Sequence, residues 1–242
     1  MPHTTLPSVR RALIVLLVGA LGCGSDLLLP DPPGGGDNLA LTKVTGDEQT
    51  GTVGETLPSP LVVKVLTERE QPATGREVSF ELSDPAAGTV TPTTSTTNSQ
   101  GEAVANWTLG TVPGPYVVVA RLVGLEGDDK IAEFRAAAKP AAPDTLSPET
   151  PLAQPGRREQ TVATAPAVRV VDRFGNPVPD VPVAWQVTAG EGNVTSPITM
   201  TDASGKTTVD WTLGNRIGVH KLTAAIGSAT GSPVTFTATV LF

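Results

Sequence analysis

The sequence predicts an all-β fold built from two tandem β-sandwiches. The stretch TNSQGEAVANWTLG, residues 97–110, returns as TDASGKTTVDWTLG, residues 201–214, so that Trp107 and Trp211 stand 104 positions apart. A period of that size indicates two copies of one domain rather than a short solenoid repeat. Apolar and polar residues alternate within both stretches, and after the amino-terminal segment no stretch repeats its apolar residues at helical spacing. The 25 glycines and 23 prolines favour turns between short strands.

Each copy contains short apolar runs of the length of a strand. In the first copy these are residues 61–66 and 78–82, separated by the polar connection TEREQPATGRE. In the second copy they are residues 167–171 and 181–187, separated by DRFGNPVPD. Short β-branched runs between turn signals are typical of a β-sandwich.

The alternation of apolar and polar residues predicts which side chains enter the core. Val209, Trp211 and Leu213 alternate with polar neighbours, as do Ala105, Trp107 and Leu109 in the first copy. The aromatic residues that we expect to form the two cores are Phe80, Trp107, Phe134, Trp185, Trp211 and Phe236.

Glycine and asparagine mark the turns. Asp202-Ala203-Ser204-Gly205 has aspartate first and glycine last, which is the pattern of a type I turn, and Gly101 occupies the last position in the first copy. Gly175 and Asn176 supply a tight reversal in the second copy. The first copy has Arg69-Glu70-Gln71-Pro72 there. Without the glycine, this turn must differ or carry strain.

The amino-terminal segment has the features of a secretory signal. Two arginines precede an apolar run, residues 12–21, that is too short to span a bilayer as a helix. The run ends in Ala20-Leu21-Gly22-Cys23, which resembles the lipobox of bacterial lipoproteins. The resemblance implies cleavage before Cys23 and lipidation of Cys23. An ordinary secretory signal with an incidental cysteine is the alternative, and the two arginines leave a twin-arginine signal as a minor one.

These features divide the chain into five segments. They are a signal peptide (1–22), a lipidated cysteine with a proline- and glycine-rich tether (23–38), a first sandwich (39–139), a short linker (140–143) and a second sandwich (144–242). Cys23 is the only cysteine, so neither sandwich contains an internal disulfide.

The composition argues against several classes of function. The net charge of −7 argues against nucleic-acid binding. His3 lies in the signal segment, and His220 aligns with Tyr116 at the start of a strand, so no catalytic group is predicted. The acidic cluster of residues 126–129 reads as a solvated turn, with calcium binding as the alternative. We therefore predict no enzyme, no cofactor and no metal site.

The run DRFGNPVPDVPVAWQVTAGEGNV, followed by TDASGKTTVDWTLG, GVHKLTA and TFTATV, resembles bacterial immunoglobulin-like domains of group 1, the invasin and intimin type. The first copy matches more loosely. The resemblance implies Ig-like sandwiches at the bacterial surface. Together with the lipobox-like signal and Gly24 after its cysteine, it leads us to predict a cell-envelope protein, at the outer membrane or cell surface, that serves structural display or protein contact. The alternative is a carbohydrate- or ligand-binding module that uses loops at one sandwich end, with Phe174 and Tyr116 as the exposed aromatic rings.

Overall fold

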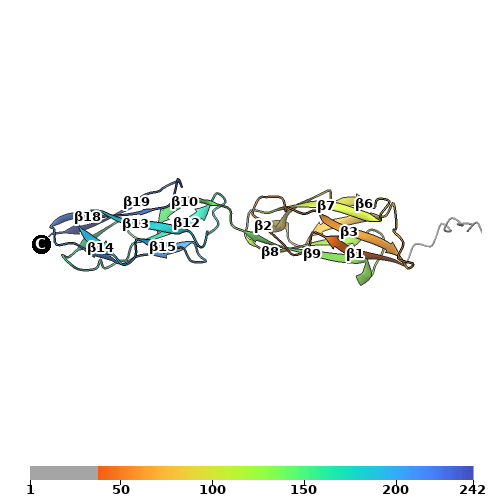
Figure 1. Cartoon of the computed structure of the whole chain (residues 1–242), viewed down its shortest axis with the longest axis horizontal. Helices are drawn as coiled ribbons and strands as arrows, with labels where there is room; N and C mark the ends of the chain where they lie inside the picture. The colour runs from red at the N-terminus through yellow and green to blue at the C-terminus, as the bar shows by residue number, and fades with distance from the viewer. Residues whose placement is uncertain (1–37, 242) are drawn as a thin grey trace, which may run out of the picture. The chain divides into compact units, whose positions relative to one another are not determined.

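The structure is a computed structural model that describes residues 38–241 (Figure 1). The predicted signal peptide, Cys23 and nearly all of the tether lie outside the described residues. Strand formation dominates the described part, and its two helical segments are short 3₁₀ turns, η1 (Pro85–Ala87) and η2 (Asp128–Lys130). The all-β prediction is confirmed.

The first sandwich consists of two sheets. One has the strand order β1-β3-β7-β5 and the other β2-β9-β8-β4-β6. The strands of this sandwich are β1 (Leu39–Thr45), β2 (Gln49–Thr52), β3 (Leu61–Thr67), β4 (Glu77–Leu82), β5 (Gly88–Thr91), β6 (Thr94–Thr96), β7 (Glu102–Leu109), β8 (Gly114–Leu122) and β9 (Ile131–Lys139).

The second sandwich repeats this arrangement with one break. Its five-stranded sheet has the order β11-β19-β18-β13-β15, while the facing strands form the sets β10-β12-β16 and β14-β17. Its strands are β10 (Pro143–Pro148), β11 (Ala153–Gly156), β12 (Ala167–Asp172), β13 (Pro182–Ala189), β14 (Gly192–Val194), β15 (Ile198–Met200), β16 (Lys206–Thr208), β17 (Trp211–Leu213), β18 (Gly218–Ala225) and β19 (Val234–Val240). The single strand β7 of the first sandwich thus corresponds to two strands, β16 and β17.

In both sandwiches a short strand pairs in parallel with the last strand. β2 pairs with β9, and β11 pairs with β19, whereas the other paired strands of the described residues run antiparallel. Parallel neighbours need a long connection, which here is the rest of each sandwich. The second strand of each sandwich, β2 or β11, therefore lies beside the strand that ends that sandwich.

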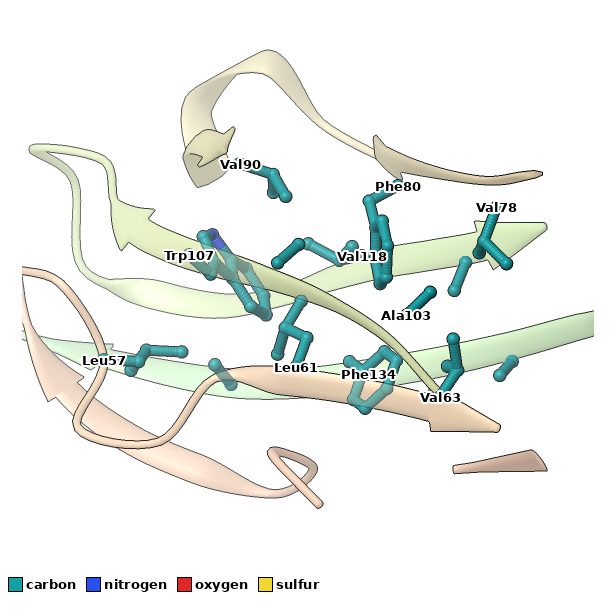
Figure 2. Close-up of a cluster of buried hydrophobic side chains, with 14 of the residues drawn as sticks. Leu57, Leu61, Val63, Val78, Phe80, Val90, Ala103, Trp107, Val118 and Phe134 are labelled. Atoms are coloured by element: carbon teal, nitrogen blue, oxygen red, sulfur yellow. The ribbon is translucent and has the colours of Figure 1, made fainter. Parts of the chain in front are cut away.

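Each sandwich has its own hydrophobic core, formed by the inward faces of its sheets. In the first core, Figure 2 shows the side chains of Trp107, Phe80 and Phe134 among aliphatic residues from both sheets. In the second core, Trp185 lies 6.2 Å from Phe236 between ring centres, and Trp211 is fully buried. All six aromatic residues that the alternation places inward are buried. That each sandwich folds independently, with the segment boundaries given above, stays a prediction.

The repeated turns share one hydrogen-bonding pattern. The N–H of Gly205 donates to the carbonyl of Asp202 at 2.8 Å, and the N–H of Gly101 donates to that of Asn98 at 2.9 Å. The Asp202 carboxylate also accepts from the N–H groups of Ser204 and Lys206. Gly205 has a φ of +72° and Gly101 a φ of +74°, a backbone conformation that favours glycine.

Of the two expectations for the turn without glycine, a different turn or a strained one, the structure shows the strained one at Glu70. Its N–H donates to the carbonyl of Thr67 at 2.9 Å, just as the N–H of Gly175 donates to that of Asp172. The two turns are therefore the same, but Glu70 adopts a φ of +58° where Gly175 has +84°. A left-handed conformation costs a non-glycine residue about 1–2 kcal/mol.

Replacing Glu70 by glycine is therefore expected to stabilise the first sandwich by about 0.5–1 kcal/mol, because the relieved strain exceeds the added chain entropy of glycine. Urea unfolding followed by signals of the first sandwich would measure this gain. Arg69→Gly is the matched control, because Arg69 is exposed and is not among the residues with positive φ. We expect it to lower the stability, and a loss of stability in both variants would contradict the strain at Glu70.

Candidate functional site

The two aromatic residues that the sequence suggested as a sugar platform do not form one. Tyr116 is only 8% exposed, so the expectation that it is exposed is wrong. Its hydroxyl donates to the carbonyl of Val112 at 2.9 Å, which holds the ring against the core. Phe174 is 38% exposed, and the guanidinium of Arg173 lies 4.7 Å from the centre of its ring. A single stacked ring remains at the surface.

His220 takes the structural role of Tyr116 in the second sandwich. Its ring is fully buried, and Nε2 lies 2.9 Å from the carbonyl oxygen of Arg216, four residues earlier, as in the pair Tyr116–Val112. A carbonyl can only accept, so Nε2 carries the hydrogen. A β-carbon at Gly190 would lie 2.4 Å from the His220 ring, so glycine is needed to make room for it. The arrangement fits a structural side chain.

The Asp172 carboxylate ties together the turn that follows β12. Its Oδ1 accepts from the N–H groups of Phe174 at 2.8 Å and Asn176 at 2.9 Å. Its Oδ2 accepts from the Ala141 N–H at 2.9 Å and from the Asn176 side chain at 3.0 Å. Asn176 was predicted as a turn residue, and its amide adds a bond to the carboxylate. The anion therefore holds both the turn and the segment that leads into β10.

Burial works against the charge of Asp172, but these hydrogen bonds outweigh it and hold its pKa below the ordinary value. Because the pKa is lowered by folding, the stabilisation is complete above the pKa of the unfolded chain and is lost as the pH falls through the folded pKa. We expect the second sandwich to lose stability below about pH 4. Asp172→Asn should remove this part of the pH dependence and cost about 1–3 kcal/mol at neutral pH. Urea unfolding between pH 2 and 7 measures both effects, and an unchanged pH profile in the variant would exclude this role.

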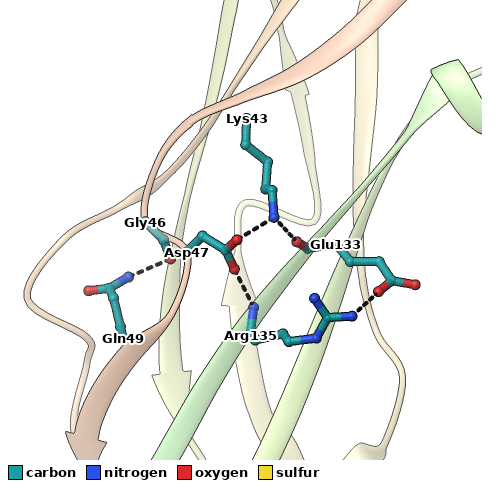
Figure 3. Close-up of polar contacts among 6 residues, drawn as sticks. All are labelled: Lys43, Gly46, Asp47, Gln49, Glu133 and Arg135. Atoms are coloured by element: carbon teal, nitrogen blue, oxygen red, sulfur yellow. Dashed lines mark hydrogen bonds and ion pairs between the residues drawn. The ribbon is translucent and has the colours of Figure 1, made fainter.

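A second carboxylate fixes the turn between β1 and β2 of the first sandwich (Figure 3). Asp47 accepts from the backbone N–H of Arg135 at 2.8 Å and pairs with Lys43, whose ammonium also donates to the carbonyl of Glu133 at 3.0 Å. Gln49 spans the same turn by donating to the carbonyl of Gly46. These contacts join the β1–β2 turn to β9. The polar residues of this turn therefore have a structural role.

The acidic residues 126–129 lie between β8 and β9. Asp129 pairs with Lys130, whose side chain is buried, and that pairing lowers the pKa of Asp129. Within residues 38–241, no group of three or more His, Cys, Asp or Glu side chains is placed to hold a metal ion. In the same range, no helix is long and apolar enough to cross a membrane.

In the second sandwich, a five-stranded sheet faces β10, β12 and β16 across an aromatic core. Its edge strand β11 pairs in parallel with β19. Residues 160–239 match the family model of the bacterial Ig-like domain (group 1). The match begins after β11 and ends within β19, so it covers most of the second sandwich and none of the first. No curated protein matches the chain in sequence.

Solved structures similar to this chain include bacterial adhesins. FdeC, an adhesin of Escherichia coli, is 17% identical with a TM-score of 0.52, over 84% of this chain and 64% of that one. The Yersinia pseudotuberculosis adhesin InvE is 21% identical with a TM-score of 0.42, over 86% of this chain and 61% of that one. The chain thus spans less than two thirds of the length of these structures. The likeness to FdeC supports the fold.

Two surface features of the second sandwich were not predicted from the sequence. One is a hollow of about 1020 Å³ whose lining includes Arg157, Arg158 and Leu241. The other is a pair of exposed apolar side chains on the edge strand β15, Ile198 at 56% and Met200 at 53%. The signal for the second feature was present in the repeat. Residues 198–200 read Ile-Thr-Met, whereas residues 94–96, at the same place in the first copy, read Thr-Ser-Thr.

Proposed function

We propose that this chain is a non-enzymatic module of the bacterial cell envelope. In this proposal two tandem Ig-like domains are held at the membrane by a lipid on Cys23 and serve structural display or adhesion-type protein contact. The observation that carries the proposal is the match of residues 160–239 to the bacterial Ig-like domain. The similarity of the fold to FdeC, which is named as an adhesin, adds support. The lipobox-like Ala20-Leu21-Gly22-Cys23 supplies the anchor.

The proposed anchor predicts that Cys23→Ser releases the chain from membranes, because serine offers no thiol for lipid attachment. Fractionation of expressing bacteria, with immunoblotting of the membrane and soluble fractions, measures this. Ser25→Ala is the matched control, since it changes a neighbouring residue and leaves Cys23 intact, and it should stay with the membranes. Continued sedimentation of the Cys23→Ser protein with the envelope would count against the lipid.

The carbohydrate-binding alternative has lost half of its aromatic platform, because Tyr116 lies in the core. Phe174 alone offers one ring with Arg173 stacked on it. A glycan array separates the two functions. The display function predicts no saturable binding, whereas saturable binding that disappears in Phe174→Ala would favour the alternative.

A further inference from the structure

The turn that follows β12 contacts the first sandwich, and both sandwiches belong to one compact unit, residues 37–242. The side-chain amide of Asn176 donates to the carbonyl of Thr111 at 2.8 Å. A β-carbon at Gly54 would lie 2.9 Å from Cζ of Phe174, so this ring lies directly on the backbone of the first sandwich. The turn of residues 172–176 is called the docking turn below.

The first sandwich contains the same turn at residues 67–71, with the same backbone hydrogen bonds. In this register Arg69 stands at the place of Phe174, and Gln71 stands at the place of Asn176. The side chains of residues 68–71 are all exposed. This turn therefore presents charged and polar groups where the docking turn presents an aromatic ring.

The second sandwich also repeats the surface that receives the docking turn. Glu159 stands at the place of Gly54, because its N–H donates to the carbonyl of Gly214 at 3.4 Å, as the N–H of Gly54 donates to that of Gly110 at 2.9 Å. The two residues share a positive φ, which is +59° at Glu159 and +75° at Gly54. The receiving surface thus has an equivalent at the far end of β11.

This equivalent surface is charged and exposed. Asn215 stands at the place of Thr111, because each follows the glycine that accepts this hydrogen bond. Arg157 and Arg158 precede Glu159 and line the hollow of about 1020 Å³. Within residues 38–241, neither of these two guanidinium groups forms an ion pair. The four residues Arg157, Arg158, Glu159 and Asn215 are called the second docking surface below.

We propose that the second docking surface binds the 67–71 turn of another copy of this chain. The contact between the two sandwiches of one chain supplies the geometry. Applied to two copies, it places Arg69 against Glu159, at the point where an aromatic ring meets a glycine within the chain. It also brings the side-chain amide of Gln71 to the carbonyl of Asn215.

The charges on the two sides are complementary. Glu68 and Glu70 lie on either side of the guanidinium of Arg69, so two negative charges and one positive charge give the tip of the turn a net charge of −1. The second docking surface has the reverse balance, because two guanidinium groups and one carboxylate give it a net charge of +1. Unlike charges steer two surfaces together and disfavour wrong partners. Complementarity of this kind selects the turn of the first sandwich as the occupant.

This contact joins two different surfaces, so it is head-to-tail and can repeat from copy to copy. Each copy in a pair keeps one turn and one docking surface open for the next copy. The contact is small and its ion pairs are exposed, so the association is weak in solution. It goes beyond the function proposed above and does not depend on a lipid at Cys23.

Disulfide trapping between two single-cysteine chains tests the proposal, because it captures weak contacts. Both chains carry Cys23→Ser, and one has Gln71→Cys while the other, with a longer tag, has Asn215→Cys. Mild oxidation of the mixture should give the mixed dimer at least about fivefold more than either same-position dimer. Asn106→Cys, which is exposed on β7, is the control for Gln71→Cys and should give no excess. A mixed dimer at the yield of random collision, or a dominant dimer of Asn215→Cys with itself, overturns the proposal.

Charge reversal tests the ion pair at the centre of the contact. Arg69→Glu on the Gln71→Cys chain, or Glu159→Arg on the Asn215→Cys chain, places like charges together and should lower the mixed-dimer yield at least about threefold. The two reversals combined should restore the yield, which a loss of folding would not do. Raising the salt concentration from about 0.05 M to about 0.5 M should lower the yield of the unreversed pair. Yields that ignore both reversals would assign the trapped dimer to another contact and refute the proposed one.

Discussion

Replacing Trp211 by alanine is expected to unfold the second sandwich while the first remains folded. The indole of Trp211 is fully buried and belongs to a core that shares no residue with the core around Trp107. Removing a buried tryptophan costs about 3–5 kcal/mol, from lost burial and from the cavity that remains. A small domain has a total stability of about 5–15 kcal/mol, so a loss of this size leaves little margin.

Hydrogen exchange measured peptide by peptide distinguishes the two sandwiches. Peptides of β12 to β19 should lose protection in Trp211→Ala, while those of β1 to β9 should keep theirs. Trp107→Ala is the matched variant and should give the opposite pattern. Simultaneous loss of protection in both halves would show that the sandwiches do not fold independently.

The two tryptophans differ in the hydrogen bonding of the indole nitrogen. Trp107 Nε1 donates to the carbonyl of Ala87 at 2.9 Å, whereas Trp211 Nε1 is buried and has no hydrogen-bond partner among the described residues. The difference follows from the chain that precedes β5 and β14. In the first sandwich the 3₁₀ segment η1, capped by Asp84, contains Ala87, while Glu191 at the corresponding place has a φ of +62° and no such segment.

The second large effect is expected for Gly205→Ala. A β-carbon at Gly205 would lie 2.4 Å from the carbonyl oxygen of Val170 and 3.1 Å from the nitrogen of Val178, and both are backbone atoms that cannot rotate away. The positive φ of the residue adds strain for any side chain. The turn also receives the Val170 N–H on its Gly205 carbonyl at 2.8 Å, so a shift would break this bond. Together these effects should cost about 3 kcal/mol or more.

Gly175→Ala is the control that separates strain from crowding. Gly175 also has a positive φ, but a β-carbon there meets no atom within 4 Å. Its cost should be limited to the left-handed conformation, about 1 kcal/mol. Urea unfolding of both variants, followed by signals of the second sandwich, measures the difference. Equal costs would mean that the close approach of Gly205 to β12 does not constrain the fold.

Much of the fold could be predicted because its signals are local. The alternation around Trp107 and Trp211 places these side chains inward whatever the neighbouring strands are, since successive residues of a strand face opposite sides. The expected runs 61–66 and 78–82 became β3 (Leu61–Thr67) and β4 (Glu77–Leu82). The missing glycine at Glu70 predicted a turn that differs or carries strain, and the structure shows the same turn with a positive φ at Glu70, because the demand for positive φ belongs to the turn itself.

Surface features were harder to predict because they depend on partners far away in the sequence. Tyr116 and Phe174 are both aromatic residues near strand ends, yet the first packs against the core and the second stays partly exposed. Burial of Tyr116 depends on the core of the first sandwich, whose residues come from strands far apart in the sequence. The four hydrogen bonds that the Asp172 carboxylate accepts were also not predicted from the sequence. One of their donors, the N–H of Ala141, lies 31 residues earlier in the chain.

The all-β class, the inward aromatic residues and the turn positions were predictable from the residues alone, because alternation and turn residues act within short segments. The repeat 104 positions apart likewise predicted two copies of one domain. Which exposed residues lie next to one another depends instead on how the strands pair in three dimensions. Ile198 and Met200 join Pro182 and Ala184 in one patch because β15 pairs with β13 in a particular register. That register is set by contacts between strands, and a shift by one residue would turn these side chains to the opposite face of the sheet.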